Sequence, residues 1–156
     1  MFTFNSFTIF FQVVSDIAGG LQELHNSGYL HCDLKTNNLL VRRIYHNRRL
    51  TRGIEGKIID LGCAHKLSAP CIPRKFNIEA YAENKLRYPA IAPEILKGVT
   101  GYTVASDVFS LGYCIWLTGA MYNINGLMDI GLKCTSKRPE NRPTLADVNK
   151  CIASLH

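Results

Sequence analysis

A carboxylate, an ammonium group and a carboxamide crowd one short polar segment of the sequence. Asp33, Lys35 and Asn38 lie in the stretch LHCDLKTNNLLV, with apolar residues on either side. A second carboxylate, Asp60, ends the apolar run KIID. Carboxylate and carboxamide oxygens suit Mg²⁺, and a lysine can neutralise anionic oxygens. These residue types are what metal-assisted chemistry on a phosphate group would require.

Each of these residues also has a simpler interpretation. Asp33 and Asn38 are common turn residues, and Asp60 could merely end a strand. One motif of this kind therefore carries little weight by itself. The surrounding elements and the other motifs decide between the two interpretations.

The polar segment follows a stretch with the apolar period of a helix. The apolar residues at spacings of three and four are Phe10, Val13, Val14, Ile17, Leu21 and Leu24. This spacing predicts one buried face of a helix over residues 10–25. Asn26, Ser27 and Gly28 supply its end, because glycine readily takes the left-handed conformation that closes helices.

Two short apolar runs, at 38–41 and 57–60, predict the strands of a small hairpin. The segment between them is basic and contains Arg42, Arg43, Arg48, Arg49 and Arg52. We interpret it as a solvated connection, with an acidic partner or RNA as the alternative. Tyr45 is the one aromatic residue among these arginines, which is too few for a base-stacking platform. We therefore do not expect nucleic-acid binding.

The second half of the chain predicts a helical core. No clear period appears between residues 61 and 86, so we expect a long loop there. A helical turn is predicted at 92–98. Residues 106–122 are apolar on nearly every side, which is typical of a central buried helix that Ser106 can cap.

Two final helices are predicted near residues 125–134 and 143–154. Thr144 precedes Asp147 at the distance of a capping box. The fold class is therefore mainly α, with a central buried helix, surrounding helices and a small β-hairpin next to the polar segment.

The composition is that of one globular domain. The chain has 156 residues, a net charge of +6 and six cysteines, and no two cysteines form a CxxC pair. We interpret the cysteines as reduced thiols of a cytoplasmic protein. The apolar first fourteen residues lack the features of a signal peptide and are too short to span a membrane, so we expect no membrane partner.

Five separated motifs resemble those of the protein kinase family and occur in the same order. HCDLKTNN resembles the catalytic loop H-R-D-L-x-x-x-N, IIDLG resembles the strand end that carries D-F-G, and IAPE resembles A-P-E. SDVFSLG is similar to the start of the family's central helix, and CTSKRPENRPTLADV is similar to its closing helices. The resemblance extends from about Phe10 to the C-terminus and identifies the C-terminal lobe, with the hairpin bearing the catalytic loop.

The resemblance implies transfer of the ATP γ-phosphoryl group to a Ser/Thr hydroxyl of a protein substrate, with Mg²⁺ as the metal. It implies that Asp33 is the catalytic base. Lys35 would be both catalytic and cofactor-binding, because it would steady the transferring phosphoryl group. Asn38 and Asp60 would hold the metal and the cofactor. Lys35 also resembles the Ser/Thr-specific version of the loop.

Four further residues are structural by the same resemblance. His31 is similar to the histidine that braces the catalytic loop. Asp107 is similar to the residue of the central helix that binds the loop's main chain. Glu94 and Arg142 are similar to the family's buried ion pair.

The sequence also departs from the family. Cys32 replaces the arginine of H-R-D, and a thiol cannot pair with phosphate, so we expect any activity to be independent of activation-loop phosphorylation. Arg87 stands where a threonine is usual, and Leu61 replaces the phenylalanine of D-F-G. The link after the central helix also leaves little room for the usual substrate-docking helix.

The N-terminal lobe is not found in the sequence: it has no Gly-rich phosphate loop and no V-A-I-K lysine. We therefore expect residues 1–156 to be a partial kinase domain, with an apolar lead-in at 1–9, that is inactive alone. The missing lobe or a partner would cover its upper surface. The alternative is a non-catalytic, pseudokinase-like binding module.

Overall fold

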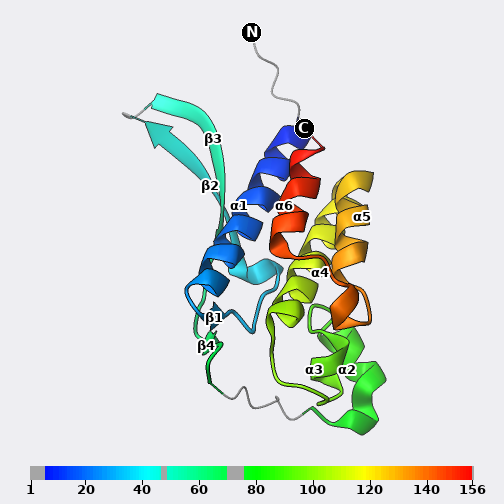
Figure 1. Ribbon diagram of the computed structural model, residues 1–156. Coiled ribbons are helices and arrows are strands. Elements are labelled where there is room, and N and C mark those ends of the chain that lie inside the picture. Colours follow the sequence, from blue (N-terminus) through cyan, green and yellow to red (C-terminus); the bar gives the residue numbers. More distant parts are fainter. Residues whose placement is uncertain (1–5, 47–48, 70–75, 156) are drawn as a thin grey trace.

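The computed structural model describes residues 6–46, 49–69 and 76–155. The described part is mainly α, with two small antiparallel sheets (Figure 1). The elements, in chain order, are α1 (Ser6–Asn26), β1 (Tyr29–Leu30), η1 (Thr36–Asn38), β2 (Leu39–His46), β3 (Arg49–Ile58), β4 (His65–Lys66), η2 (Ile78–Ala80), α2 (Tyr81–Arg87), α3 (Pro93–Leu96), α4 (Val104–Tyr122), α5 (Asn125–Cys134), η3 (Pro139–Asn141) and α6 (Leu145–Ala153).

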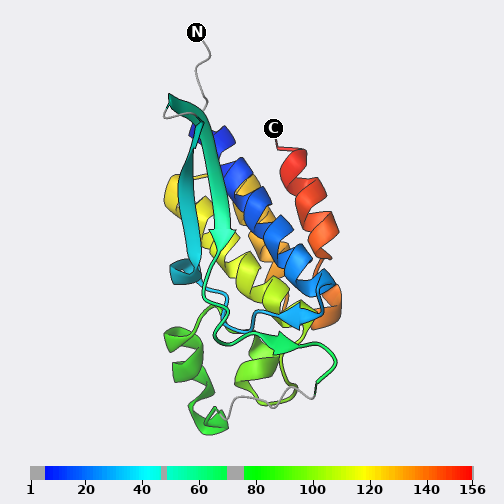
Figure 2. The same ribbon diagram turned by 90° about the vertical axis from the view of Figure 1, so that its left-hand side faces the viewer.

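Helix α4 is the central buried helix. It lies among α1, α5 and α6, while α2 and α3 gather at one end of the bundle (Figures 1 and 2). The predicted cap at Ser106 was wrong. Thr103 is the N-cap and accepts a hydrogen bond from the Ser106 main-chain N–H at 3.2 Å, while Ser106 Oγ accepts one from the Thr103 N–H at 2.8 Å. Ser106 therefore closes a capping box from the third helical position.

Helices α4 and α5 pack closely because glycines line their contact. A Cβ atom at Gly131 would lie 2.5 Å from the main-chain nitrogen of Trp116, and one at Gly112 would overlap Cys134. Asn123 and Ile124 alone connect the two helices, and Asn123 takes the left-handed conformation with φ +56°. The short connection and the small residues together hold α5 directly against α4.

The hydrophobic core lies between α1, α4, α5 and α6. Its fully buried members include Ala18, Leu21, Leu127, Cys134 and Ile152. Burial of a large aliphatic side chain such as that of Leu21 or Ile152 stabilises the fold by about 1.5–3 kcal/mol. The predicted helical period of residues 10–25 is confirmed, because Val13, Val14, Ile17 and Leu21 of α1 all face this core.

The hairpin of β2 and β3 runs alongside α1 (Figure 2). The main-chain N–H of Gly56 donates to the Asp16 carboxylate of α1 at 3.0 Å. The contact leaves no room for a side chain at position 56, because a Cβ at Gly56 would lie 2.5 Å from the Val13 carbonyl oxygen. The hairpin is thereby fixed to the helix that precedes the polar segment 31–38.

The strands are longer than the sequence predicts. Pairing continues beyond the apolar runs, and Arg42 lies opposite Glu55. Their side chains form an ion pair of 2.7 Å, and the hydrogen bond from Arg42 is the main cause that lowers the pKa of Glu55. The charge of Arg42 is therefore paired within the hairpin. Residues 47 and 48 and the side chains of 45–52 lie outside the described part, so the prediction for the rest of the basic segment stays untested.

The interval 61–86 is not the single long loop that we predicted. It contains the short strand β4, paired with β1, as well as η2 and most of α2. Helix α2 has no buried residue, so its sequence lacks the periodic apolar positions that indicate a helix. Residues 70–75, which include Pro70 and Pro73, lie outside the described part.

The remaining helices agree with the predictions. Helix α3 lies within the helical turn predicted at 92–98, and α5 and α6 fall within the two predicted final helices. Thr144 caps α6 by accepting from the Asp147 N–H at 3.2 Å. Of the described helices, only α4 has the length and apolarity to cross a membrane, and its burial at the centre of the fold accounts for that composition.

Candidate catalytic site

The loop that carries the polar cluster is suspended from the central helix. Asp107 of α4 accepts hydrogen bonds from the main-chain N–H groups of His31 at 2.8 Å and of Cys32 at 3.0 Å. Its carboxylate is buried and also contacts His25 Nε2 at 2.9 Å. Three donors thus surround one buried carboxylate, which compensates for its loss of water.

Cys32 has a main-chain conformation that non-glycine residues rarely adopt, with φ +63°. Such a residue costs about 1–2 kcal/mol, so the surrounding contacts must impose it. The two hydrogen bonds to Asp107, from the N–H groups of His31 and Cys32, hold the main chain just before this bend. They fix the direction in which the chain leaves β1 toward Asp33.

His31 braces the loop from below. Its ring is fully buried, with Nδ1 3.3 Å from the Asp33 main-chain nitrogen and Nε2 3.3 Å from the Ile59 carbonyl oxygen. The Asp33 N–H can only donate, so Nδ1 accepts, and Nε2 carries the proton that it donates to Ile59. One neutral imidazole therefore joins the catalytic loop to the segment that leads to Asp60.

Asp33, Lys35 and Asn38 form one hydrogen-bonded cluster. Lys35 Nζ lies 2.7 Å from Asp33 Oδ2. Asn38 Nδ2 donates to the Asp33 carbonyl oxygen at 2.8 Å and to Oδ2 at 3.3 Å. The two contacts with Oδ2, from Lys35 and from Asn38, orient the Asp33 carboxylate. The amide oxygen of Asn38 takes part in none of these hydrogen bonds.

Asp60 reaches this cluster through the main chain. The Ile59 N–H donates to the Asn38 carbonyl oxygen at 2.9 Å, which ties the end of β3 to the end of the catalytic loop. Asp60 also has a left-handed conformation, with φ +63°, and its Oδ1 accepts from the Gly62 N–H at 3.1 Å. This turn leaves Oδ2 outside that hydrogen bond.

The donor set fits Mg²⁺ better than a transition metal. Among the described residues, no group of three or more His, Cys, Asp or Glu side chains lies close enough to hold a metal. Asn38 and Asp60 instead offer one carboxamide and one carboxylate oxygen on adjoining segments. Mg²⁺ typically uses one or two such protein ligands and completes its shell with water and substrate phosphates.

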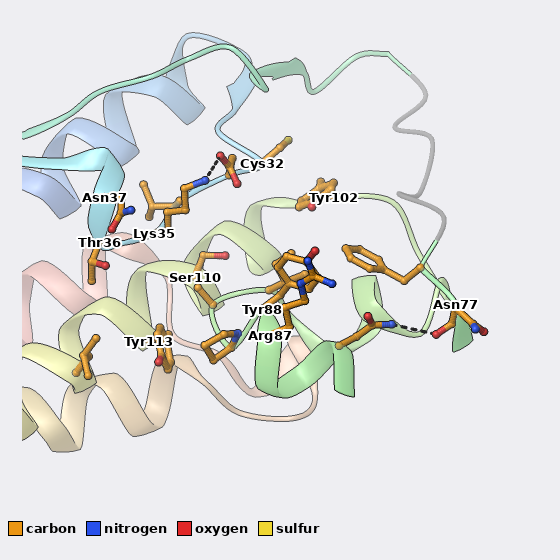
Figure 3. A pocket seen from close by; sticks show the side chains of 18 residues that line it. Cys32, Lys35, Thr36, Asn37, Asn77, Arg87, Tyr88, Tyr102, Ser110 and Tyr113 are labelled. Carbon is orange, nitrogen blue, oxygen red and sulfur yellow. Dashed lines mark hydrogen bonds and ion pairs between the residues drawn. The ribbon is translucent and has the colours of Figure 1, made fainter. Parts of the chain in front are cut away.

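A cleft of about 760 Å³ opens in front of Asp33. Figure 3 shows Lys35, Thr36 and Asn37 on one wall, with Ser110 and Tyr113 of α4 below and Arg87 and Tyr88 on the far side. The Arg87 guanidinium carbon lies 5.6 Å from the centre of the Tyr88 ring. Asn38 and Asp60 do not line this cleft.

A buried ion pair anchors helix α3, which directly follows the cleft-lining segment 87–91. Arg142 forms a double hydrogen bond with Glu94 of α3, at 2.6 and 2.8 Å. It also donates to the carbonyl oxygens of Ala105 and Ser136. Both side chains are buried, and removing one partner of such a pair costs about 3–5 kcal/mol. The pairing that the resemblance implied is confirmed.

Two features of the site were not found in the sequence. His25 was taken only as the last residue of a helix, although it contacts the carboxylate of Asp107. Its Nδ1 is buried with no hydrogen-bond partner in the described part. The outward-facing apolar group at the base of the hairpin, Leu40, Ile59 and Leu61, was also missed, with exposed fractions of 45%, 40% and 55%. Strand alternation alone could have indicated Leu40, since Leu39 faces the core.

Comparison with known proteins places this geometry in a family. The model of the protein kinase domain matches residues 6–125. The serine/threonine/tyrosine-protein kinase HT1 of Arabidopsis thaliana is 32% identical over 142 residues, which cover 90% of this chain and 32% of that protein.

Two animal proteins show a similar level of identity. The inhibitor of nuclear factor kappa-B kinase subunit alpha of Danio rerio is 34% identical over 67% of this chain and 12% of its own length. The proto-oncogene serine/threonine-protein kinase mos of Rattus norvegicus is 34% identical over 65% of this chain and 25% of its own length. The chain thus spans about a third or less of these curated relatives. The family match, the order of the motifs and the suspended catalytic loop agree, and the chain belongs to the protein kinase family.

Proposed function

We propose that this chain supplies the catalytic half of a kinase site that transfers the γ-phosphoryl group of ATP to a Ser/Thr hydroxyl of a protein. One observation carries the proposal. The Asp33–Lys35–Asn38 cluster is fixed both to the central helix, through Asp107, and to the Asp60 segment, through Ile59. Phosphoryl transfer depends mainly on such positioning and on charge neutralisation.

The contacts of each residue support its proposed role. Asp33 faces the cleft and accepts the proton of the substrate hydroxyl, while the contacts of Asn38 hold its carboxylate in place. Lys35 lies within the same cluster and neutralises negative charge on the phosphoryl oxygens. Asn38 and Asp60 would hold Mg²⁺, which would supply positive charge against the phosphates of ATP. The Lys35–Asp33 ion pair is half-exposed, so it opens at little cost when a substrate enters.

The exposed apolar group at the base of the hairpin bears on what completes the site. Leu40 and Ile59 point away from the core next to the proposed metal ligands. An adenine ring and a covering protein surface would both bury apolar area here. We propose that the upper surface is covered by an N-terminal lobe in a longer protein or by a separate partner. The chain alone is then inactive or nearly so.

A test must separate binding from catalysis. Isothermal calorimetry of the 156-residue chain with Mg²⁺ and a non-hydrolysable ATP analogue measures binding, with Asp60→Asn as the variant that loses it. Phosphoryl transfer to Ser/Thr peptides is then measured on the longest natural product of the gene that contains these residues. Activity that survives Asp33→Asn undiminished contradicts the proposal.

A non-catalytic binding module is the second candidate, and two substitutions favour it. Arg87 faces the cleft where the family usually has a threonine. Cys32 stands where relatives have an arginine that pairs with the phosphate of a phosphorylated activation loop. The retained pair of Asn38 and Asp60 argues against it, because a binding module has no need of metal ligands. Absence of Mg²⁺-nucleotide binding in both the chain and its longest natural form would favour this second function over catalysis.

A further inference from the structure

A second concave surface lies beside the catalytic cleft, between α2, α3, α4 and α5. This groove has a volume of about 540 Å³. Its floor is aromatic and aliphatic, with Phe109, Tyr113 and Trp116 from α4 and Leu132 from α5. Leu132 lines the groove from α5 and is 58% exposed. The groove is thus an apolar surface that the described part of the chain leaves uncovered.

The position of Trp116 follows from the close packing of the two helices. Gly131 leaves no room for a side chain between its own Cα and Trp116, so α5 lies directly against the main chain of α4 at this point. The Trp116 ring is directed to the side of that contact, where its centre lies 6.2 Å from the Tyr113 ring. The connection of Asn123 and Ile124 is too short to fold back over these rings.

The charge at the rim has one sign. Lys85, Lys97 and Lys137 line the groove, from three separate parts of the chain, and no carboxylate of the described residues lines it. Lys97 Nζ lies 5.1 Å from the centre of the Tyr81 ring, which holds this ammonium group beside the aromatic floor. The nearest acidic residue of α3, Glu94, is buried and paired with Arg142. The lysines therefore have no counter-charge within the groove.

We propose that this groove binds an acidic amphipathic segment of a partner protein, with apolar side chains on Trp116 and carboxylates on the rim lysines. An apolar floor with lysines around it is complementary to a helix that carries leucines on one face and glutamates beside them. A second copy of the chain is the less suitable occupant, because each copy carries a net charge of +6. Ile91 and Tyr113 line both the groove and the catalytic cleft, so the partner segment docks next to the proposed substrate site.

The chain contains a single tryptophan, so its fluorescence reports on the groove directly. The probe is an acetylated helical peptide with leucines at positions i, i+3, i+4 and i+7 and glutamates on both flanks. We expect its addition to the 156-residue chain to shift the Trp116 emission to shorter wavelength, with saturation. We also expect weaker binding at higher salt, because the rim contacts are electrostatic.

The lysine variants decide the assignment. The double substitution Lys97→Glu and Lys137→Glu should weaken peptide binding about tenfold or more, since it replaces attraction by repulsion at two exposed contacts. The matched control, Lys66→Glu with Lys150→Glu, changes the net charge equally on exposed residues that do not line the groove. It should leave affinity within about twofold. Leu132→Ser tests the apolar floor and should also weaken binding.

Three results would overturn the proposal. The first is equal or tighter binding of a peptide in which lysines replace the glutamates. The second is an equal loss of affinity in the groove and control variants. The third is self-association of the chain alone by sedimentation, with a concentration-dependent shift of the Trp116 emission. None of these readouts depends on catalytic activity.

Discussion

The carboxylate of Asp107 accepts a hydrogen bond from the main-chain N–H of His31 at 2.8 Å, across 76 residues of sequence. This contact makes the geometry of the catalytic loop a property of the central helix. The loop needs such support, because it contains Cys32 with a positive φ angle immediately after His31. Several predictions on stability and activity depend on this arrangement and on the packing around it.

Asp107→Ala should destabilise the fold by about 3 kcal/mol or more. The substitution leaves the buried N–H group of His31 and the partly buried N–H group of Cys32 without their acceptor, and an unsatisfied buried group costs about 1–3 kcal/mol. Urea unfolding monitored by circular dichroism measures the change in free energy. Ser110→Ala is the control on the same helix, because the Ser110 hydroxyl donates its hydrogen bond to the Ser106 carbonyl oxygen within the helix rather than to another element. A loss of less than 1 kcal/mol for Asp107→Ala would contradict the supporting role.

Asp33→Asn should lower phosphoryl transfer by about 10²–10⁴-fold, the usual contribution of a general base. Nucleotide binding should change little, because the metal ligands proposed here are Asn38 and Asp60. The measurement combines peptide phosphorylation by the longest natural product with calorimetry of the Mg²⁺-nucleotide complex. Asp129→Asn, an exposed carboxylate of α5, is the control. Equal losses of binding and of rate would place Asp33 among the nucleotide ligands instead.

Removal of phosphate from the activation segment should leave activity unchanged. The thiol of Cys32 cannot form the ion pair by which an arginine at this position would recognise a phosphate. The protein is treated with a phosphatase of broad specificity, and mass spectrometry confirms that Ser68, Tyr81 and Tyr88 are unmodified. Phosphoryl transfer is then compared before and after treatment. A loss of most of the activity would show that another cation has taken over this recognition.

Gly131→Ala should destabilise the fold by about 1–3 kcal/mol, because the new methyl group has no space beside Trp116. Gly19→Ala on α1 is a matched control, since nothing lies within 4 Å of its Cβ position. There the substitution should stabilise the helix by about 0.5–1 kcal/mol. Thermal and urea unfolding of the two variants should therefore shift in opposite directions. Shifts of the same sign would mean that the two helices separate easily.

The thiols should divide into reactive and protected groups. Burial raises the pKa of Cys114 to about 12, and burial is also the main cause that raises the pKa of Cys134 to about 12. At pH 8 a disulfide reagent should react with exposed Cys63 at once and with the two buried thiols only after unfolding. Rapid modification of Cys114 in the folded protein would contradict the described packing.

These raised pKa values also predict loss of stability in alkali. The folded state holds the two thiol protons more tightly than the unfolded state, in which the pKa of a thiol is about 8.5. Their contribution to stability is therefore complete below that pH and disappears as the pH rises toward 12. Urea midpoints measured between pH 8 and pH 11 should fall steadily. A midpoint that stays constant above pH 9 would show that water reaches the thiols in the folded state.

The elements that the sequence predicted well are those with a buried face. Helix α1 repeats apolar residues at the helical period, and α4 is apolar on nearly every side because other helices surround it. Helix α2 buries none of its residues, so its sequence carries no such period. The outer parts of β2 and β3 were missed for a related reason, since their paired side chains include exposed Arg42 and Glu55.

The site divides in the same way. Asp33, Lys35, Asn38 and Asp60 stand in local motifs whose order in the chain indicated the family. The contact of His25 with Asp107 joins residues 82 positions apart and depends on how α1 crosses α4. The groove around Trp116 likewise exists only after four elements have packed together. No local pattern in the sequence could indicate either of them.

The ion pair of Glu94 and Arg142 also has a consequence for biosynthesis. The two residues are 48 positions apart, and the ribosome adds about 5–20 residues per second. Glu94 is therefore synthesised several seconds before Arg142, and its carboxylate remains unpaired during that time. During that interval α3 has no anchor, so the groove that Pro93 and Leu96 line forms late in translation. A pause of the ribosome between these two codons would prolong the exposure of the unfinished groove to chaperones.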